Sequence, residues 1–232
     1  MGSAPVPHGV AVSSLSGLSP NFGKRRGGLR PGLIVLHYTG MASCDAARDR
    51  LCDPAADVSA HYLISQGGDI SALVPEAMRA WHAGAGAWRG QDDINSRSIG
   101  IELANGGAEP FAASQMRALE GLLDAVMARW SIPPQGVIAH SDMAPERKAD
   151  PGARFDWHRL ARGGLSVWPQ GTEPGRPGDF ITDARRFGYP DASDDRMLAA
   201  FRLRFRPWAK GPVDAVDAGM IADLADRFGS PL

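Results

Sequence analysis

The sequence predicts an α/β protein with a mixed central β-sheet flanked by helices, followed by a small three-helix bundle. Short, almost continuous apolar runs at residues 33–36, 98–103 and 137–140 are typical of strands buried on both faces of a sheet. Residues 116–130 carry apolar side chains at helical spacing, so strands alternate with helices. The proline- and glycine-rich residues 169–178 separate this part from a helical C-terminus.

The first part of the chain is predicted to be an irregular arm that leads into a buried strand. Residues 1–30 are rich in serine, proline and glycine. The strand over residues 33–36 then runs into His37. A helix is predicted over residues 43–51, because a serine can cap its start and a proline soon follows its end.

The middle of the chain is predicted to contain three further strands and the longest helix. Residues 60–65 and 70–74 form two of the strands, joined by a glycine-containing turn. Residues 81–90 are rich in glycine and tryptophan and are predicted to be a loop, and residues 98–103 are the third strand. The helix over residues 116–130 ends before two consecutive prolines.

The last part of the sequence is predicted to end in the bundle. Residues 155–165 are helical in part, and three amphipathic segments follow at residues 180–187, 194–205 and 213–228. A bundle of about 55 residues is near the lower limit for folding alone. The predicted organisation is an arm over residues 1–30, a main α/β domain over residues 31–168, a linker over residues 169–178 and a helical domain over residues 179–232.

Composition and charge are those of an ordinary globular protein. A chain of 232 residues is long enough to bury a sizeable core, and its composition of 44% apolar and 22% charged residues is typical of soluble globular domains. A formal net charge of -1 gives no indication of a nucleic-acid partner. We also expect no membrane span, because no apolar run approaches the roughly 20 residues that a membrane helix needs.

The N-terminus and the cysteines indicate a reducing compartment. Residues 1–30 lack the apolar core of a signal peptide, so we expect a cytoplasmic protein. A periplasmic or cell-envelope location is the alternative if the native N-terminus is truncated. Cys44 and Cys52 would lie about 12 Å apart on one helix, which is too far for a disulfide. We interpret both as small buried apolar side chains.

Two histidines and an aspartate are the most informative polar residues. His37 ends one predicted strand and His140 ends another, and functional sites of α/β sheets gather at the carboxyl ends of strands. Asp150 follows on a loop that prolines stiffen. Neutral imidazoles and a hard carboxylate suit zinc, and three protein ligands leave a fourth position open, as in catalytic zinc sites. Either histidine taken alone is more often an ordinary core or surface residue.

The strings around these residues resemble a known family. LIVLHYTG contains His37, and VIAHSDMAPERKADPG contains His140 and Asp150. They resemble the two ligand segments of the zinc-dependent N-acetylmuramoyl-L-alanine amidases, the amidase_2 family, whose fold peptidoglycan recognition proteins share. The resemblance covers roughly residues 20–160. It implies the family's α/β fold and one zinc ion per chain, held by His37, His140 and Asp150.

The activity that the resemblance implies is hydrolysis of the amide bond between N-acetylmuramic acid and the L-alanine of the stem peptide. Its partners would be peptidoglycan fragments (muropeptides) or intact peptidoglycan. Ordinary and 1,6-anhydro N-acetylmuramic acid both stay open as substrates. The C-terminal bundle resembles the peptidoglycan-binding domains of wall hydrolases through less specific motifs. A bundle that braces the catalytic domain or shapes its cleft is the alternative.

The resemblance also assigns two catalytic residues. Glu102 is implied as general base and proton shuttle. A glutamate between Ile101 and Leu103 is an odd choice for structure alone, although a surface-facing strand residue is the alternative. Lys148 lies two residues before Asp150, so both side chains face one site if that piece is extended. It is implied to stabilise the oxyanion, whereas without the resemblance it would be a solvated loop lysine.

Four further residues are candidates for substrate binding, because similar sequence strings occur near the sugar and peptide in family members: Asn95, Arg97, Trp81 and His82. Asn95 is expected to form a hydrogen bond with the peptide stem, and Trp81 is expected to form an apolar wall of the binding site. Buried packing is an equally good interpretation of Trp81. We expect His61 in the core or supporting its neighbours by hydrogen bonds, and no role for His8 or His158.

Three other functions fit parts of the same pattern. A peptidoglycan recognition module that binds without cutting typically lacks a zinc ligand, whereas this chain has all three and also Glu102 and Lys148. A structural zinc site usually fills four protein positions, often with cysteine, and neither cysteine lies near the ligand segments. A zinc peptidase that cuts elsewhere in the stem peptide is excluded only by the resemblance.

Overall fold

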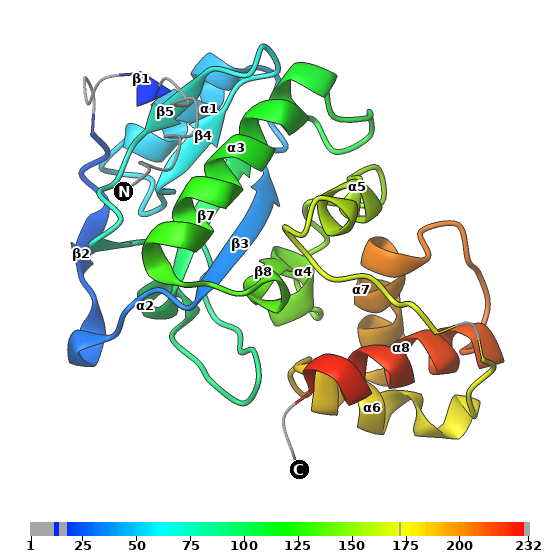
Figure 1. The fold of residues 1–232 in the computed structure, drawn as a ribbon. Helices are drawn as coiled ribbons and strands as arrows, with labels where there is room; N and C mark the ends of the chain where they lie inside the picture. Colours follow the sequence, from blue (N-terminus) through cyan, green and yellow to red (C-terminus); the bar gives the residue numbers. More distant parts are fainter. Residues whose placement is uncertain (1–11, 14–17, 172, 230–232) are drawn as a thin grey trace, which may run out of the picture.

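The computed structural model describes residues 12–13, 18–171 and 173–229 (Figure 1). His8 and part of the predicted arm lie outside the described residues. A mixed sheet with helices on both faces forms the larger part of the molecule, and three C-terminal helices pack together beside it. The predicted α/β class is therefore confirmed. No helix in the described part of the chain is long and apolar enough to cross a membrane.

The central sheet has six strands in the order β1-β5-β4-β7-β3-β8. Neighbouring strands run parallel, except that β4 and β5 form an antiparallel pair. Strands β3 and β7 lie inside the sheet and are buried on both faces, which explains their nearly continuous apolar runs. The bounds are β1 Val12–Ser13, β3 Leu33–Tyr38, β4 Tyr62–Ile64, β5 Ile70–Ala72, β7 Ser98–Leu103 and β8 Val137–Ala139.

One face of the sheet is covered by α3 (Ala113–Trp130) and α5 (Trp157–Arg162). Ile34 and Leu36 of β3 belong to this core, together with the apolar face of α3. Successive side chains of a strand point to opposite faces, so His37 points to the other face of the sheet. The register of the core thus decides which face receives the polar residues.

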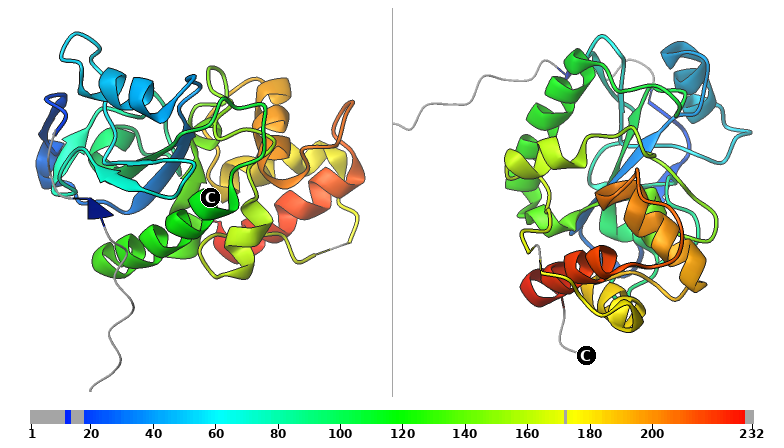
Figure 2. Two further views of the ribbon diagram at one scale, coloured as in Figure 1. Left: turned by 90° about the horizontal axis from the view of Figure 1, so that it is seen from above. Right: turned by 90° about the vertical axis from the view of Figure 1, so that its right-hand side faces the viewer.

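The other face is covered in two places, with the functional residues between them. Helix α1 (Cys44–Cys52) begins at Ser43, whose hydroxyl accepts a hydrogen bond from the Ala46 N–H at 3.1 Å, as the predicted cap requires. Leu51 of α1 packs in a small core with Leu63 of β4. The two cysteines at the ends of this helix form no disulfide with each other and are partly buried. Figure 2 (left) shows α1 and α3 on opposite sides of the sheet.

The second cover consists of the C-terminal helices α6 (Phe180–Phe187), α7 (Asp194–Phe205) and α8 (Ala215–Phe228), which a short 3-10 turn, η3 (Pro177–Asp179), precedes. Their aromatic residues belong to the same apolar cluster as Val35, Ile138 and Met143 of the main domain. The segment predicted as a linker also lies against α8, because the Gly175 N–H donates to the Ala215 carbonyl at 2.8 Å. The helices therefore share one continuous core with the sheet, and the predicted domain boundaries stay a prediction.

Several short elements were not predicted. Their three or four residues carry too little periodicity to be recognised. Strand β2 pairs antiparallel with β6, so the predicted arm is not irregular throughout. The strand predicted over residues 137–140 ends one residue early, and His140 begins a helical turn instead. The unpredicted elements of three or four residues are β2 Phe22–Lys24, η1 Arg26–Gly28, β6 Met78–Ala80, α2 Ile94–Arg97, η2 Pro134–Gly136, α4 His140–Met143 and η3 Pro177–Asp179.

Candidate metal centre and active site

The candidate site lies at the carboxyl ends of three neighbouring parallel strands. His37 of β3 is paired with Glu102 of β7, and β8 on the other side of β3 is followed directly by His140. Asp150 lies on the loop after α4, where its carbonyl accepts a hydrogen bond from the Ser141 N–H at 3.1 Å. The parallel sheet thus brings together side chains that lie far apart in the sequence.

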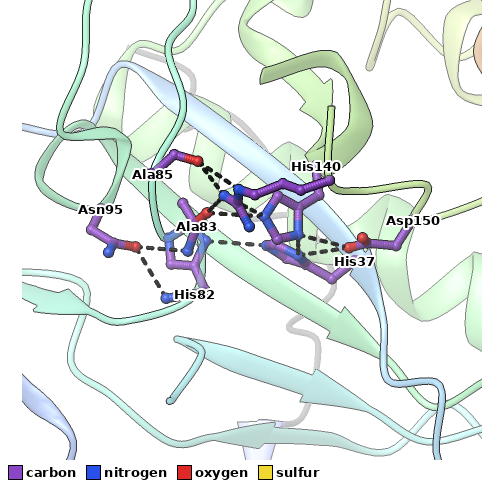
Figure 3. A network of polar contacts seen from close by, with 8 residues as sticks. His37, His82, Ala83, Ala85, Asn95, His140 and Asp150 are labelled. Atoms are coloured by element: carbon purple, nitrogen blue, oxygen red, sulfur yellow. Dashed lines mark hydrogen bonds and ion pairs between the residues drawn. The ribbon is translucent and has the colours of Figure 1, made fainter. Parts of the chain in front are cut away.

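Three ligand-type atoms converge between these elements (Figure 3). The Nδ1 atoms of His37 and His140 are 2.9 Å apart. Each of them lies 3.0 Å from Oδ2 of Asp150. All three side chains are buried.

The other ring nitrogen of His140 determines its tautomer. Nε2 of His140 lies 3.0 Å from the carbonyl oxygen of Ala83. A carbonyl only accepts, so Nε2 carries the proton and donates it. In the neutral imidazole, Nδ1 of His140 then keeps a lone pair that points at the shared centre. Arg147 donates to the carbonyls of Ala83 and Ala85 and so holds the loop in place.

A chain of hydrogen bonds determines the tautomer of His37 in the same way. The Ser98 hydroxyl donates to the Ile94 carbonyl at 2.6 Å, so its oxygen accepts from Nε2–H of His82 at 3.1 Å. Nδ1 of His82 is then an acceptor for Nε2–H of His37, also at 3.1 Å. Nδ1 of His37 therefore carries no proton.

Electrostatics favour a cation at this centre. Burial, followed by the neighbouring His140, lowers the pKa of His37 to about 4, so this imidazole is neutral near pH 7. Burial and then the neighbouring His37 also lower the pKa of His82. Two unprotonated nitrogens and a carboxylate oxygen about 3 Å apart repel one another unless a positive charge lies between them.

The donor set fits zinc. Two imidazole nitrogens and one carboxylate oxygen are the three-ligand pattern of catalytic zinc sites. Both imidazoles are oriented through a hydrogen bond from their second nitrogen, which is the usual support of such ligands. Among the described residues, His37, His140 and Asp150 form the group whose ligand atoms all lie within 4.8 Å of one another. The structure therefore contains a buried metal-ligand triad.

Glu102 stands beside the triad with an oxygen atom that has no partner. Its Oε2 is buried and makes no hydrogen bond. Burial, followed by the charge of Asp150, raises the pKa of Glu102 to about 8, whereas Lys148 acts in the opposite direction. Leaving a buried polar atom unpaired costs free energy, so a group outside the chain is expected to satisfy it.

The triad and Glu102 line one cavity of about 610 Å³. Lys148, Trp81 and His82 line the same cavity, so the structure brings these predicted residues to the site. Both ring nitrogens of His82 already form hydrogen bonds, one with His37 and one with Ser98. Its geometry therefore supports orientation of His37 rather than contact with a substrate.

Asn95 and Arg97 do not line this cavity, and their part in substrate binding stays a prediction. Oδ1 of Asn95 accepts from the N–H groups of His82 and Ala83 at 3.0 and 2.8 Å, so it shapes the loop. Arg97 precedes β7 and donates to the Asp92 carbonyl at 3.1 Å. It lies at the opposite end of the strand from Glu102, about 16 Å away at the rise of a β-strand.

Supporting residues were missed by sequence reasoning because they contact the site only through the fold. Ser98 holds His82, and a side chain at Gly100 would collide with the His82 ring, since its Cβ would lie 2.4 Å away. A glycine inside a buried strand often indicates such a close approach, and this was the available signal. His61 is buried as expected, with Nδ1 accepting from the Gly100 N–H at 2.9 Å.

Fold and site together define a class of protein. Metal-dependent hydrolases use two imidazole nitrogens and a carboxylate oxygen to hold their ion, and here this donor set lies at the strand ends of an α/β sheet beside the unpaired oxygen of Glu102. The Amidase_2 family, described as N-acetylmuramoyl-L-alanine amidase, matches residues 27–153. The chain belongs to this family, as the sequence resemblance implied.

Relatives and solved structures agree with this assignment. The chain is 36% identical to N-acetylmuramoyl-L-alanine amidase AmiD of Escherichia coli, over 85% of this chain and 83% of AmiD. It is 34% identical to 1,6-anhydro-N-acetylmuramyl-L-alanine amidase AmpD of Citrobacter freundii, over 61% of this chain and 85% of AmpD. The E. coli AmiD structure with bound substrate matches with a TM-score of 0.80 and 33% identity, covering 87% of this chain and 91% of AmiD. AmpDh3 of Pseudomonas aeruginosa matches with a TM-score of 0.78 and 28% identity, covering 97% and 99%.

Proposed function

We propose that this protein is a zinc-dependent N-acetylmuramoyl-L-alanine amidase that releases the stem peptide from muropeptides. The observation that carries the proposal is the convergence of two unprotonated Nδ1 atoms and one carboxylate oxygen beside the unpaired Oε2 of Glu102. His37, His140 and Asp150 would hold the ion. Zinc bound there would supply Lewis acidity, the chemistry that makes water nucleophilic near neutral pH.

The side chains around the triad have separate parts in the proposed reaction. Glu102 accepts a proton from the attacking water and delivers it to the amide nitrogen, which must be protonated to leave. Its buried oxygen and raised pKa of about 8 suit a group that both accepts and returns a proton. Lys148 lines the same cavity, where its positive charge can stabilise the developing oxyanion. Trp81 would form an apolar wall for the substrate.

The substrate class follows from the solved relatives. AmiD of E. coli has been captured with the substrate anhydro-N-acetylmuramic acid-L-Ala-D-gamma-Glu-L-Lys, and AmpDh3 with an anhydromuramic pentapeptide. We infer that this chain also accepts the 1,6-anhydro form of the sugar. A cytoplasmic location stays a separate prediction, which fractionation of cells that make the full-length protein tests.

A defined substrate tests the reaction. The zinc-loaded protein is incubated with anhydro-N-acetylmuramoyl-tripeptide, and the products are separated and weighed by mass spectrometry. We expect the free tripeptide and anhydro-N-acetylmuramic acid, with Glu102→Gln as the inactive control. Shorter peptides released with the sugar still attached to alanine would instead indicate a stem peptidase. Binding without any product would indicate a recognition module.

A further inference from the structure

The metal ligand His140 belongs to a helical turn that the C-terminal helices hold in place. Asp142 lies two residues after His140 in α4 and is completely buried. Its Oδ2 accepts a hydrogen bond from the Ala139 N–H at 2.9 Å and another from the Arg204 guanidinium of α7. Its Oδ1 accepts from the Tyr189 hydroxyl at 2.9 Å. Two of these three donors come from the C-terminal part of the chain.

The Arg204 side chain forms its hydrogen bonds with the main domain, although Arg204 belongs to α7. Its side chain is 1% exposed, and it donates to the Val137 carbonyl at 3.0 Å and to the Ser166 hydroxyl at 3.1 Å. The guanidinium also lies 4.4 Å from the ring centre of Trp157. Arg204 thus connects α7 both to the start of β8 and to the turn that begins with His140.

Tyr189 and its neighbours also support the loop that accepts the hydrogen bond from Nε2 of His140. The Tyr189 ring packs edge-on against Trp88 with 5.3 Å between ring centres, and the Gly188 carbonyl accepts from the Arg89 N–H at 2.8 Å. Trp88 and Arg89 lie in the loop whose Ala83 carbonyl receives Nε2–H of His140. The C-terminal helices therefore hold both the backbone of His140 and its hydrogen-bond acceptor.

A turn of this length depends on such external contacts. Helix α4 has only four residues, and a single helical turn is not stable on its own. Its conformation determines where Nδ1 of His140 points. Without its partners on α7 and at Tyr189, the Asp142 carboxylate would be buried with an unpaired charge, which favours rearrangement of the turn.

We propose that Arg204 and Tyr189 are positioning residues for the metal ligand His140. The C-terminal helices are then part of the support of the metal centre and not a detachable module. The inference rests on the proposed zinc amidase function, because it assigns these residues an effect on zinc affinity.

The test compares two buried arginines of the same helix. Arg204→Met removes the charge that pairs with Asp142. Arg202→Met is the matched control, since Arg202 is also buried and pairs with the buried Asp217 inside the helical part, away from α4. Zinc affinity is measured by competition with a chromophoric chelator, and thermal unfolding is measured on the same samples.

We expect both arginine variants to unfold at lower temperature, but only Arg204→Met to bind zinc more weakly, by about 10–100-fold. Tyr189→Phe removes one hydroxyl and should weaken zinc binding in the same direction by a smaller factor. Arg204→Lys keeps the charge and should restore part of the affinity. If Arg204→Met does not fold, Tyr189→Phe and Arg204→Lys decide the question.

Wild-type zinc affinity in Arg204→Met and Tyr189→Phe would overturn the inference. An equal loss in Arg202→Met would do the same, because it would show an effect of general destabilisation. The proposed function fails differently: in that case the wild-type protein itself binds no zinc, or binds it and leaves the muropeptide intact.

Discussion

His37 and Glu102 occupy paired positions on the neighbouring parallel strands β3 and β7. Their side chains therefore point from the same face of the sheet, and the proposed zinc ligand and the proposed base are neighbours because of strand register alone. A shift of one residue would turn Glu102 into the apolar core between the sheet and α3. The large apolar residues around both positions make such a shift costly.

Removing a metal ligand should abolish both zinc binding and turnover. We expect His37→Ala and His140→Ala each to lose the single zinc ion, because two remaining ligands do not hold it against dialysis. Elemental analysis of dialysed protein and an assay on the anhydro-muropeptide measure the two effects. His158→Ala, which changes an exposed histidine, is the control and should keep both. Full activity in a thoroughly demetallated wild-type sample would contradict the mechanism.

Changing Glu102 should separate chemistry from metal binding. Glu102→Gln keeps the size of the side chain but removes its ability to take a proton. We expect turnover to fall by about 10²–10³ while zinc content and thermal unfolding stay near wild type. Lys148 is left intact in this variant, so the loss reports the proton transfer. Wild-type turnover in Glu102→Gln would mean that another residue is the base.

A single methyl group on β7 should disturb the metal centre. The Cβ of an alanine at position 100 would lie 2.4 Å from the His82 ring, so His82 must move and His37 loses its hydrogen-bond partner. We expect zinc affinity to fall by about 10–100-fold in Gly100→Ala. Gly23→Ala in β2 meets open space and is the matched control. Equal affinity in both variants would show that His82 does not support the ligand.

Acid sensitivity should depend in part on His61. Burial lowers the pKa of His61 to about 3, far below the usual value of about 6.5. Between these two pH values His61 binds a proton in the unfolded chain but not in the folded chain, so stability is lost as the pH falls below about 6.5. His61→Gln removes this linkage. The free energy of unfolding of the wild type should fall, relative to that of the variant, by about 1.4 kcal/mol for each pH unit between about pH 6 and pH 4.

Urea unfolding of both proteins at a series of pH values measures this difference. Because both proteins carry the same metal ligands, release of zinc in acid affects them alike. A difference that does not change with pH would mean that His61 is protonated in the folded protein.

Truncation within residues 169–178 should damage the main domain. Val35, Ile138 and Met143 would lose the apolar cover that the C-terminal helices provide. We therefore expect lower solubility, lower thermal stability and weaker activity on the soluble muropeptide, with no specific loss of binding to purified sacculi. If instead the full-length protein sediments with sacculi and the truncated one stays free with its activity intact, the bundle is a wall anchor.

Local patterns were sufficient for most of the fold. Strand β7 and helices α6 and α7 have the predicted bounds, because apolar periodicity over six or more residues reports burial directly. Elements such as β2 and α4 could not be predicted, because residues distant in the sequence stabilise them. The same limit applies to Asn95 and Arg97, whose side chains form hydrogen bonds with neighbouring loop residues in the fold, while their part in substrate binding stays a prediction.

The sequence by itself determined the family, the α/β class and the identity of His37, His140 and Asp150 as the converging set. The class follows from apolar patterns, and the family and the ligand set follow from local strings that resemble the amidase_2 family, all of which the chain carries before it folds. Only the tertiary structure decided which nitrogen of each histidine faces the centre, and that Arg204 supports the turn of His140. Such relations depend on hydrogen bonds between strands, loops and helices that meet only when the whole core is packed.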